Sequence, residues 1–508
     1  MSPNENQSKK VIIIGAGIAG LSVASYLRQN GYETEIYEKH SCAGGLCTAW
    51  KRKGYTIDYC IHWLYGSKPG TSFHTLYNEL GALSGPEGKQ VEIVDFEIFG
   101  TIELSNGDSF TLYSDIALLQ KEMLRIAPED RKKINSLCKD IRKISKFDFA
   151  QATEQWGLSG WLKYIYTQAP RVPTILKRIN TKVEDVVSTI KSPLLKEVLL
   201  TRVPAEWSIF ALIFSLSAQI GRNGGYPKGG SLSLVNNMTN RYLSLGGKIY
   251  YNAPVSTVVT KNDRASGVIL NDGKEIHGDH IISAADGHYT LFTMLNGDFL
   301  PDTLKKAYSQ YPLFPSTLFI ALGVRNDLLD LPHAVSMILK EPIEVDDGSV
   351  IDRLSVRVFN FDPSLSPPGK CLVTVTAYTG NDLYWENLKE QSVKRYEKQK
   401  KAIAERVIEE LDVRFKNISD AIEMVDVSTP HTVKRYTGNW HGSMEGFAPT
   451  PASLSKSLPK TLPGLKNFYM TGQWTTPGGG IPPAVSSGRS VCIKICKSDG
   501  KKPRFSTS

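Results

Sequence analysis

One stretch near the start of the chain constrains its fold more than any other, namely residues 11–38, VIIIGAGIAGLSVASYLRQNGYETEIYE. The four apolar residues 11–14 predict a buried parallel strand. Gly15, Gly17 and Gly20 follow in the pattern G-x-G-x-x-G, which predicts a tight turn into a helix. A strand, a glycine turn and a helix in this order predict an α/β fold with a Rossmann-like unit.

Each of these glycines has its own physical reason. Gly15 allows the tight turn, Gly17 has no Cβ and lets a pyrophosphate approach the backbone, and Gly20 lets the helix pack close to the strand. Unpaired N–H groups at the start of the helix, where Ala19 lies, would meet the phosphates. The sequence therefore predicts a dinucleotide site at this turn.

A carboxylate follows the second predicted strand, residues 33–37, which comes after a helix stop at Gly31. Glu38 suits hydrogen bonds from both ribose hydroxyls and would repel the 2′-phosphate of NADP. Lys39 comes next and is included in the predicted site. The dinucleotide bound here is therefore expected to lack that phosphate.

Length and charge indicate a chain with several parts. With 508 residues, two or three packed units are expected. The net charge is +9, and residues 116–200 carry 16 Lys plus Arg against 9 Asp plus Glu. Such a segment can contact an anionic membrane surface, bind nucleic acid or simply present solvated helix faces. We expect no nucleic acid partner and leave open a peripheral contact with a membrane.

Targeting signals and metal motifs are not evident in the sequence. The first ten residues are polar, and the apolar stretch 207–220 is shorter than the roughly 20 residues of a spanning helix. The seven cysteines are scattered and form no C-x-x-C pair, so we expect reduced thiols and no metal site. These features predict a cytoplasmic protein, with peripheral attachment to a membrane left open.

After Lys39 the chain carries motifs that go beyond a dinucleotide turn. A glycine pair, Gly44 and Gly45, is followed by G-Y-T-I-D and an I-H-W turn. With the preceding motif, this pattern resembles the FAD-dependent amine oxidase and phytoene desaturase superfamily, most of all its carotenoid desaturase, carotenoid isomerase and retinol saturase branch. The resemblance implies that Gly44, Gly45, Leu46 and His62 lie near the phosphates or the flavin. Leu46 stands where many members of the superfamily have Arg.

Two later segments strengthen the resemblance. Residues 225–286 have the order P-x-G-G, helix, L-G-G, strand, P-V, hairpin and I-I-S-A-A-D, and residues 464–496 contain G-Q-W-T-T-P-G-G-G-I-P-P. The resemblance implies that Val255 packs near the adenine and that Ala285 closes a turn beside the cofactor. It also implies cofactor contacts at the isoalloxazine end from Gly472, Gly480, Ile481 and Pro482.

These motifs suggest a division of the chain into three parts. We expect an FAD-binding domain built from residues 10–115, 221–300 and 424–500. Residues 116–220 are expected to form a helical insertion, a possible cap toward substrate or membrane. Residues 301–423 are expected to form a mixed α+β substrate-binding domain. The sequence does not indicate an oligomeric state.

The resemblance implies an FAD-dependent oxidoreductase that acts on a hydrophobic polyene or isoprenoid. Hydride would pass between a substrate carbon and flavin N5, in a desaturase, saturase or isomerase, with NAD as a possible electron partner. His62 and His441 are candidates for proton handling, and Asp58 and Tyr65 lie nearby in the sequence. Two alternatives stay open at this point: an amine oxidase that releases hydrogen peroxide, and a non-catalytic flavin-binding lipid carrier.

Overall fold

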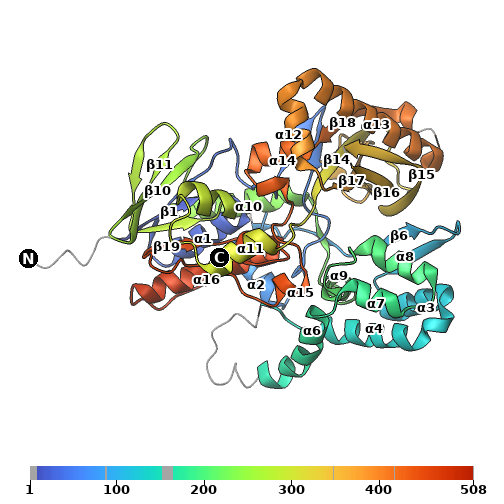
Figure 1. The fold of residues 1–508 in the computed structure, drawn as a ribbon, viewed down its shortest axis with the longest axis horizontal. Coiled ribbons are helices and arrows are strands. Elements are labelled where there is room, and N and C mark those ends of the chain that lie inside the picture. The colour runs from blue at the N-terminus through green and yellow to red at the C-terminus, as the bar shows by residue number, and fades with distance from the viewer. Residues whose placement is uncertain (1–7, 86–87, 151–163, 347, 417, 507–508) are drawn as a thin grey trace, which may run out of the picture.

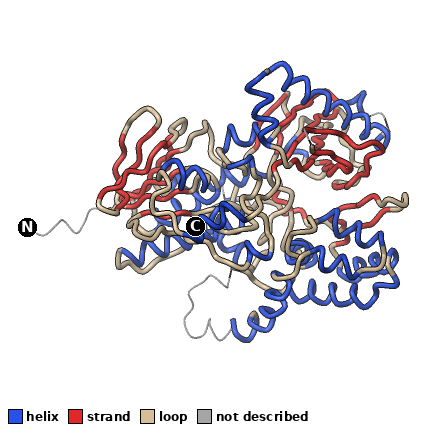
Figure 2. Tube along the Cα trace, viewed as in Figure 1, coloured by secondary structure: helices blue, strands red, loops and turns tan. Residues whose placement is uncertain are grey.

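The computed structural model describes residues 8–85, 88–150, 164–346, 348–416 and 418–506. Residues 1–7 of the polar N-terminal segment and residues 151–163 of the expected helical insertion lie outside the described residues. Figures 1 and 2 show three groups of elements, namely a sheet with flanking helices, a second sheet with its own helices, and a cluster of helices.

The glycine turns are positioned by a five-stranded parallel sheet. Its order is β19 (Phe468–Met470), β13 (His280–Ser283), β1 (Lys10–Ile14), β2 (Glu33–Tyr37) and β9 (Lys248–Tyr250). The pairing is parallel throughout, with Val11 opposite His280 and Ile281 opposite Phe468. Strands from the start, middle and end of the chain thus share one sheet, and the predicted α/β fold is confirmed.

Two helices beside this sheet pack closely against each other, α1 (Ile18–Gln29) and α16 (Ile481–Ser498). A Cβ on Gly488 of α16 would lie 2.9 Å from the backbone nitrogen of Val23 in α1, so only glycine fits. Other elements complete this unit: α2 (Ser72–Glu79), α10 (Gly230–Ser244), α11 (Asp302–Gln310), α14 (Pro430–Thr437), α15 (Pro451–Leu454), the π-helical turn Tyr289–Met294, and the strands β3 (Ala49–Arg52), β4 (Tyr55–Asp58), β5 (Ile93–Val94), β8 (Tyr226–Pro227), β10 (Val255–Lys261), β11 (Arg264–Leu270) and β12 (Glu275–His277).

A seven-stranded mixed sheet forms the second group. Its order is β18 (Ile422–Ser428), β14 (Ser316–Val324), β17 (Cys371–Thr379), β16 (Ser349–Val358), β15 (Ala334–Asp346), β6 (Ile98–Glu103) and β7 (Ser109–Tyr113). The helices α12 (Asp382–Gln391) and α13 (Val393–Phe415) cover it, and α13 buries Ile403, Val407 and Leu411 as its apolar spacing predicts.

This sheet takes strands from two segments that the sequence assigns to the FAD-binding part. The strands β6 and β18, within residues 10–115 and 424–500, pair with β15 and β14 of the second sheet. The physical reason is that an alternating strand shows which face is buried, but not which neighbour it pairs with. The hairpin itself, with its Asn106–Gly107 turn, forms as expected.

The third group consists of helices from residues 116–220. They are α3 (Ile116–Ile126), α4 (Arg131–Ile144), α6 (Val172–Ile179), α7 (Val183–Thr189), α8 (Pro193–Arg202) and α9 (Ile209–Ile220). Asp115 caps α3 as expected, because its carboxylate accepts from the N–H groups of Ala117 at 2.8 Å and Leu118 at 2.9 Å. The apolar stretch α9 lies in the core of this cluster. Of the helices that the structure describes, none combines the length and the apolar character needed to cross a bilayer.

Candidate active site

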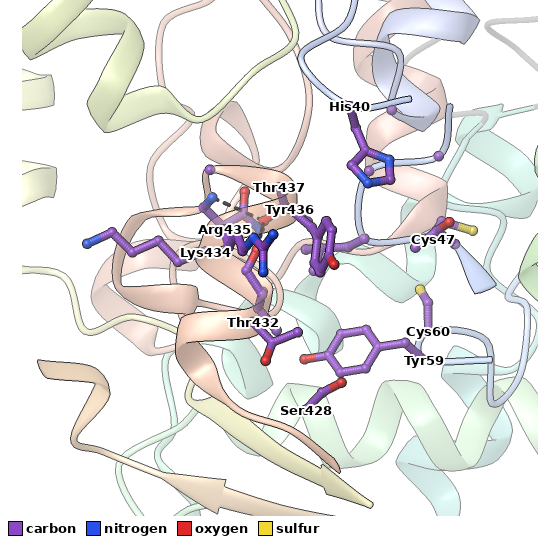
Figure 3. A pocket seen from close by; sticks show the side chains of 18 of the residues that line it. His40, Cys47, Tyr59, Cys60, Ser428, Thr432, Lys434, Arg435, Tyr436 and Thr437 are labelled. Atoms are coloured by element: carbon purple, nitrogen blue, oxygen red, sulfur yellow. Dashed lines mark hydrogen bonds between the residues drawn. The ribbon is translucent and has the colours of Figure 1, made fainter. Parts of the chain in front are cut away.

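One cavity of about 1500 Å³ is lined by both glycine-rich ends of the chain. That volume exceeds the roughly 300–1,000 Å³ of an ordinary ligand pocket, so it can hold more than one small molecule. Figure 3 shows Tyr59 and Cys60 on one side of the cavity and side chains of α14 on another. The predicted cofactor residues that line it are Gly15, Gly17, Ala19, Glu38, Lys39, Gly44, Gly45, Leu46, Val255, Ala285, Gly472, Gly480 and Ile481.

In the first glycine turn, Gly17 leaves space for a ligand, whereas Gly20 has no space for any side chain. A Cβ on Gly20 would lie 2.0 Å from the carbonyl oxygen of Gly15, so Gly20 serves the close packing of helix on turn and does not line the cavity. Gly17 has an ordinary φ of −70°, and its nearest neighbour, the Gly44 oxygen, would be 3.9 Å from a Cβ. The space beside Gly17 is therefore open for a phosphate.

The carboxylate of Glu38 is buried and already holds the turn. It accepts hydrogen bonds from the backbone N–H groups of Ala16 at 2.7 Å and His40 at 2.8 Å. A carboxylate offers about four acceptor positions, so two hydroxyl groups can still bind. Glu38 therefore stabilises the turn and can also hold a ribose.

The glycine pair packs directly against the first turn. Gly44 donates its N–H to the Ala16 oxygen at 3.0 Å and has φ +122°, while Gly45 has φ +63° and lies close to the Cα of Gly17. Both φ values belong to the region that favours glycine. This contact aligns two stretches of free backbone along one wall of the cavity.

The last glycine turn forms the opposite end of the same cavity. Gly472 and Gly480 have φ +99° and +91°, and Gly480 precedes the first turn of α16. Pro482 and Pro483 occupy that first turn but carry no N–H group, so Ile481 provides the backbone donor there. Pro482 itself is not among the lining residues. Ile481 can therefore place one donor and the helix dipole against negative charge.

Neither histidine expected to handle protons lines this cavity. His62 is half-buried, and its pKa is lowered to about 3, mainly by burial and also by the charge of Arg357. It is therefore neutral near pH 7. The Nδ1 atom of His441 is 2.9 Å from the carboxylate of Asp382. Its side chain is 38% exposed.

The other two candidates have structural roles in the described chain. Asp58 is buried and accepts from the N–H groups of Cys60 and Ser231 and from the Ser231 hydroxyl at 2.6 Å. Tyr65 is also buried, and its hydroxyl donates to the carbonyl of Phe147 at 3.3 Å. Both side chains therefore fix loops beside the site.

A carboxyl group that the sequence analysis missed does line the cavity. Glu445 lies in the loop before α15, and a Cβ on Gly480 would lie 3.9 Å from its Oε1 atom. Burial raises its pKa to about 7. Single acids in glycine-rich loops follow no periodic pattern, and the only sequence signal was its place in the W-H-G-S-x-E-G segment. Glu445 can therefore exist in both protonation states at neutral pH.

These features can be compared with known proteins. A model of the flavin containing amine oxidoreductase family matches residues 18–496. The chain belongs to this family. The match confirms the resemblance deduced from the motifs and makes the protein a flavin-containing oxidoreductase. The expected NAD electron partner receives no support from it.

Similar proteins extend over nearly the whole chain. A chloroplastic prolycopene isomerase of Daucus carota is 26% identical over 94% of this chain and 78% of its own. A lycopene-forming phytoene desaturase of Paracoccus sp. is 25% identical over 97% of this chain and 98% of its own. A solved oxidoreductase structure from Methanosarcina mazei, 19% identical, shares the fold with a TM-score of 0.58 over 95% of this chain and 99% of its own.

Proposed function

We propose that this protein is an FAD-dependent oxidoreductase that acts on a hydrophobic polyene or isoprenoid. When bound, FAD would take a hydride from a substrate carbon in a desaturation, give one in a saturation, or take and return one in an isomerisation. The observation that carries the proposal is the single cavity shared by the glycine turns at both ends of the chain. An extended flavin dinucleotide needs contacts along such a length.

The described residues fit FAD on several counts. The space beside Gly17 and Gly45 suits the pyrophosphate, Glu38 suits the ribose, and Val255 packs at the end of the cavity assigned to the adenine. Ile481 places a helix N-terminus at the flavin end. When bound, FAD supplies the two-electron chemistry, and the protein orients the substrate and excludes water.

The remaining part of the cavity suits an apolar substrate. Apolar and aromatic side chains line it next to the last glycine turn, among them Trp50, Tyr59, Met444 and Trp474. Both carotenoid relatives named above are enzymes, which favours catalysis over the carrier alternative. Their names also favour a polyene over an amine.

Glu445 is the residue to which we assign proton transfer. Its carboxyl group faces the cavity beside Gly480. Because its pKa is about 7, its Oε atoms can give a proton to a substrate carbon or take one from it. The neutral His62 and the partly exposed His441 are less suited to this task.

Anaerobic incubation with polyenes tests the proposed function. We expect the purified protein to be yellow, and its flavin absorption to change when a carotenoid or retinoid is added to the oxidised or the dithionite-reduced protein. A saturated hydrocarbon of equal length serves as the control. A folded protein that takes up no FAD, or a flavin that responds only to amines and releases peroxide, would contradict the proposal.

We also propose that the helical insertion contacts a membrane surface peripherally. The helical insertion exposes apolar side chains next to its basic residues: Ile165 is 41%, Leu176 53% and Tyr166 85% exposed. Apolar side chains among basic ones suit an anionic lipid surface, from which an oily substrate could be taken up. Sedimentation with anionic vesicles tests this, and binding that is unchanged in a Leu176→Ser, Tyr166→Ser variant would contradict it.

A further inference from the structure

Two half-buried arginines lie near the active site without an ion-pair partner among the described residues. Arg202 ends α8, and Arg357 lies on β16. The Nε atom of Arg202 is buried and has no hydrogen-bond partner among the described residues. Arg357 makes one long contact, from Nη1 to the carbonyl oxygen of His62 at 3.4 Å. No carboxylate of the described chain lies within ion-pair distance of either guanidinium group.

Another arginine of the same strand forms an ion pair with the same helix. Near the other end of this interface, Arg353 of β16 donates to Glu197 of α8 at 2.8 Å. Arg357 lies four residues further along the strand and Arg202 five residues further along the helix, and neither has such a carboxylate partner among the described residues. Like charges that lie near each other repel in a medium of low dielectric constant.

Ring and hydrogen-bond contacts place the two arginines near each other. Arg357 contacts the backbone of His62, and Arg202 lies over the Phe99 ring, which contacts the next residue, Trp63. The charge of Arg202 also lowers the pKa of Arg357, after the larger effect of burial. Toward the cavity, Tyr378 of β17 contacts the Phe314 ring, and the Phe314 N–H donates to the carbonyl oxygen of Gly446, the neighbour of the cavity-lining Glu445, at 2.7 Å.

These polar groups are accessible from outside the protein. Tyr378 has 58% of its surface exposed, and His62, Arg202 and Arg357 are half-buried. A small molecule can therefore reach them.

Aromatic side chains continue from this charged site. The Arg202 guanidinium lies 5.4 Å from the centre of the Phe99 ring, and Phe99 contacts Trp63, which contacts Phe214. On the other side, Tyr378 contacts Phe314 at a centroid distance of 6.4 Å. Tyr378 and Phe314 thus form an aromatic wall that leads toward the Glu445 loop.

We propose that Arg202 and Arg357 bind the carboxylate of an unsaturated, apolar carboxylic acid, whose chain lies along the aromatic wall toward Glu445. The inference rests on the proposed function and narrows its substrate class. Guanidinium groups bind planar carboxylates by paired hydrogen bonds, and the Tyr378 hydroxyl can add a third donor. A single carboxylate also supplies the negative charge that this pair of arginines lacks.

Matched ligands that differ only in the head group test the inference. The FAD-loaded protein is titrated with retinoic acid and retinol, and with linoleic acid and linoleyl alcohol, while the flavin absorption is recorded. We expect each acid to bind roughly 10- to 100-fold more tightly than its alcohol, as for hydrogen bonds to a charged group. Arg202→Gln and Arg357→Gln should lose this preference and bind the alcohols as before. Arg353→Gln, the control on the same interface, should keep it.

Several outcomes would overturn the inference. Equal affinities of the wild-type protein for acid and alcohol refute it even if the arginine variants fail to fold, and they leave the flavin function intact. Tighter binding of geranylgeranyl diphosphate than of either acid would assign the arginines to a phosphate instead. Failure of the wild-type protein to bind FAD would refute the proposed function as well, so the two failures are distinguishable.

Discussion

The two ends of the active-site cavity are built in opposite ways. At the glycine end, the backbone forms the surface: Gly17 and Gly45 lie close together, and neither has a side chain where a phosphate would approach. At the other end, Glu445 lines the cavity, and Arg202 and Arg357 lie half-buried nearby on α8 and β16. The comparison teaches that cofactor binding depends on the absence of side chains, whereas the proposed substrate chemistry depends on charged side chains that have no ion-pair partner among the described residues.

The largest effect is expected for a substitution at Gly20, which serves helix packing and does not line the cavity. In Gly20→Ala the new Cβ would lie 2.0 Å from the Gly15 oxygen, which is backbone and cannot move aside. We expect a loss of about 3 kcal/mol or more in the free energy of unfolding, with loss of bound flavin. Thermal melts and flavin absorbance check this. Gly380→Ala is the control, because Gly380 has open space and should tolerate the change; a Gly20→Ala protein as stable as that control would contradict the packing argument.

The next largest effect is a loss of turnover when Glu445 is replaced. Glu445→Gln keeps the shape of the side chain but cannot exchange a proton, so we expect turnover to fall roughly 100-fold or more while flavin content stays unchanged. The wild-type rate should change with an apparent pKa near 7. It falls above that pH if Glu445 donates a proton and below it if Glu445 accepts one. Glu397→Gln, an exposed acid on the same cavity, is the control. An unchanged pH profile in Glu445→Gln would remove this residue from the mechanism.

Gly17→Ala sharpens the comparison at the glycine end with a smaller change. Its Cβ meets no protein atom closer than 3.9 Å, and its φ of −70° suits alanine. The protein should therefore fold normally but bind FAD about 10-fold more weakly, because the new methyl group occupies the phosphate approach. Isothermal titration of the flavin-free protein measures this. Unchanged affinity would place the pyrophosphate elsewhere.

Stability should respond to pH through Glu445. The pKa of Glu445 is 4.5 in the unfolded chain and about 7 in the folded protein. Between pH 4.5 and 7 the folded state therefore keeps a proton that the unfolded state has released, and the free energy of unfolding falls as the pH rises through this range. Below about pH 4.5 both states are protonated, and this loss is absent. We expect Glu445→Gln to be more stable than wild type by about 1–2 kcal/mol at pH 8, with little gain at pH 5. Urea unfolding at both pH values tests this; an equal gain at both would exclude the titration.

The smallest effect is expected outside the cavity. His441→Gln removes a half-exposed pair with Asp382, so we expect a cost below about 1 kcal/mol and turnover within about threefold of wild type. A larger loss of turnover, with flavin content unchanged, would restore His441 as a proton-handling residue.

The sequence predicted the glycine end well because its geometry is local. Gly15, Gly20 and Gly44 lie within 30 residues of each other, and their roles follow from backbone conformation alone. The helices α1, α3 and α16 also began where apolar spacing and capping residues predicted. Strand neighbours were less predictable, since β6 and β18 joined the second sheet.

The charged groups at the other end of the cavity could not be predicted from local sequence patterns. Glu445, Arg202, Arg357 and Tyr378 are far apart in the chain, and each is an ordinary residue of its own loop, helix or strand. Only packing brings them together, and burial by that packing raises the pKa of Glu445 and lowers the pKa of Arg357. His62, by contrast, looked suitable in the sequence, but burial and, to a smaller extent, the charge of Arg357 lower its pKa to about 3, so it is neutral near pH 7.

The sequence by itself determined the dinucleotide turn, the α/β class and the family, because glycine spacing and apolar periodicity act over short distances. The tertiary structure alone decided which strands share a sheet, which carboxyl group faces the cavity and which charges lie near each other. Those properties depend on desolvation and on Coulomb interactions between segments, and neither exists until the chain has folded.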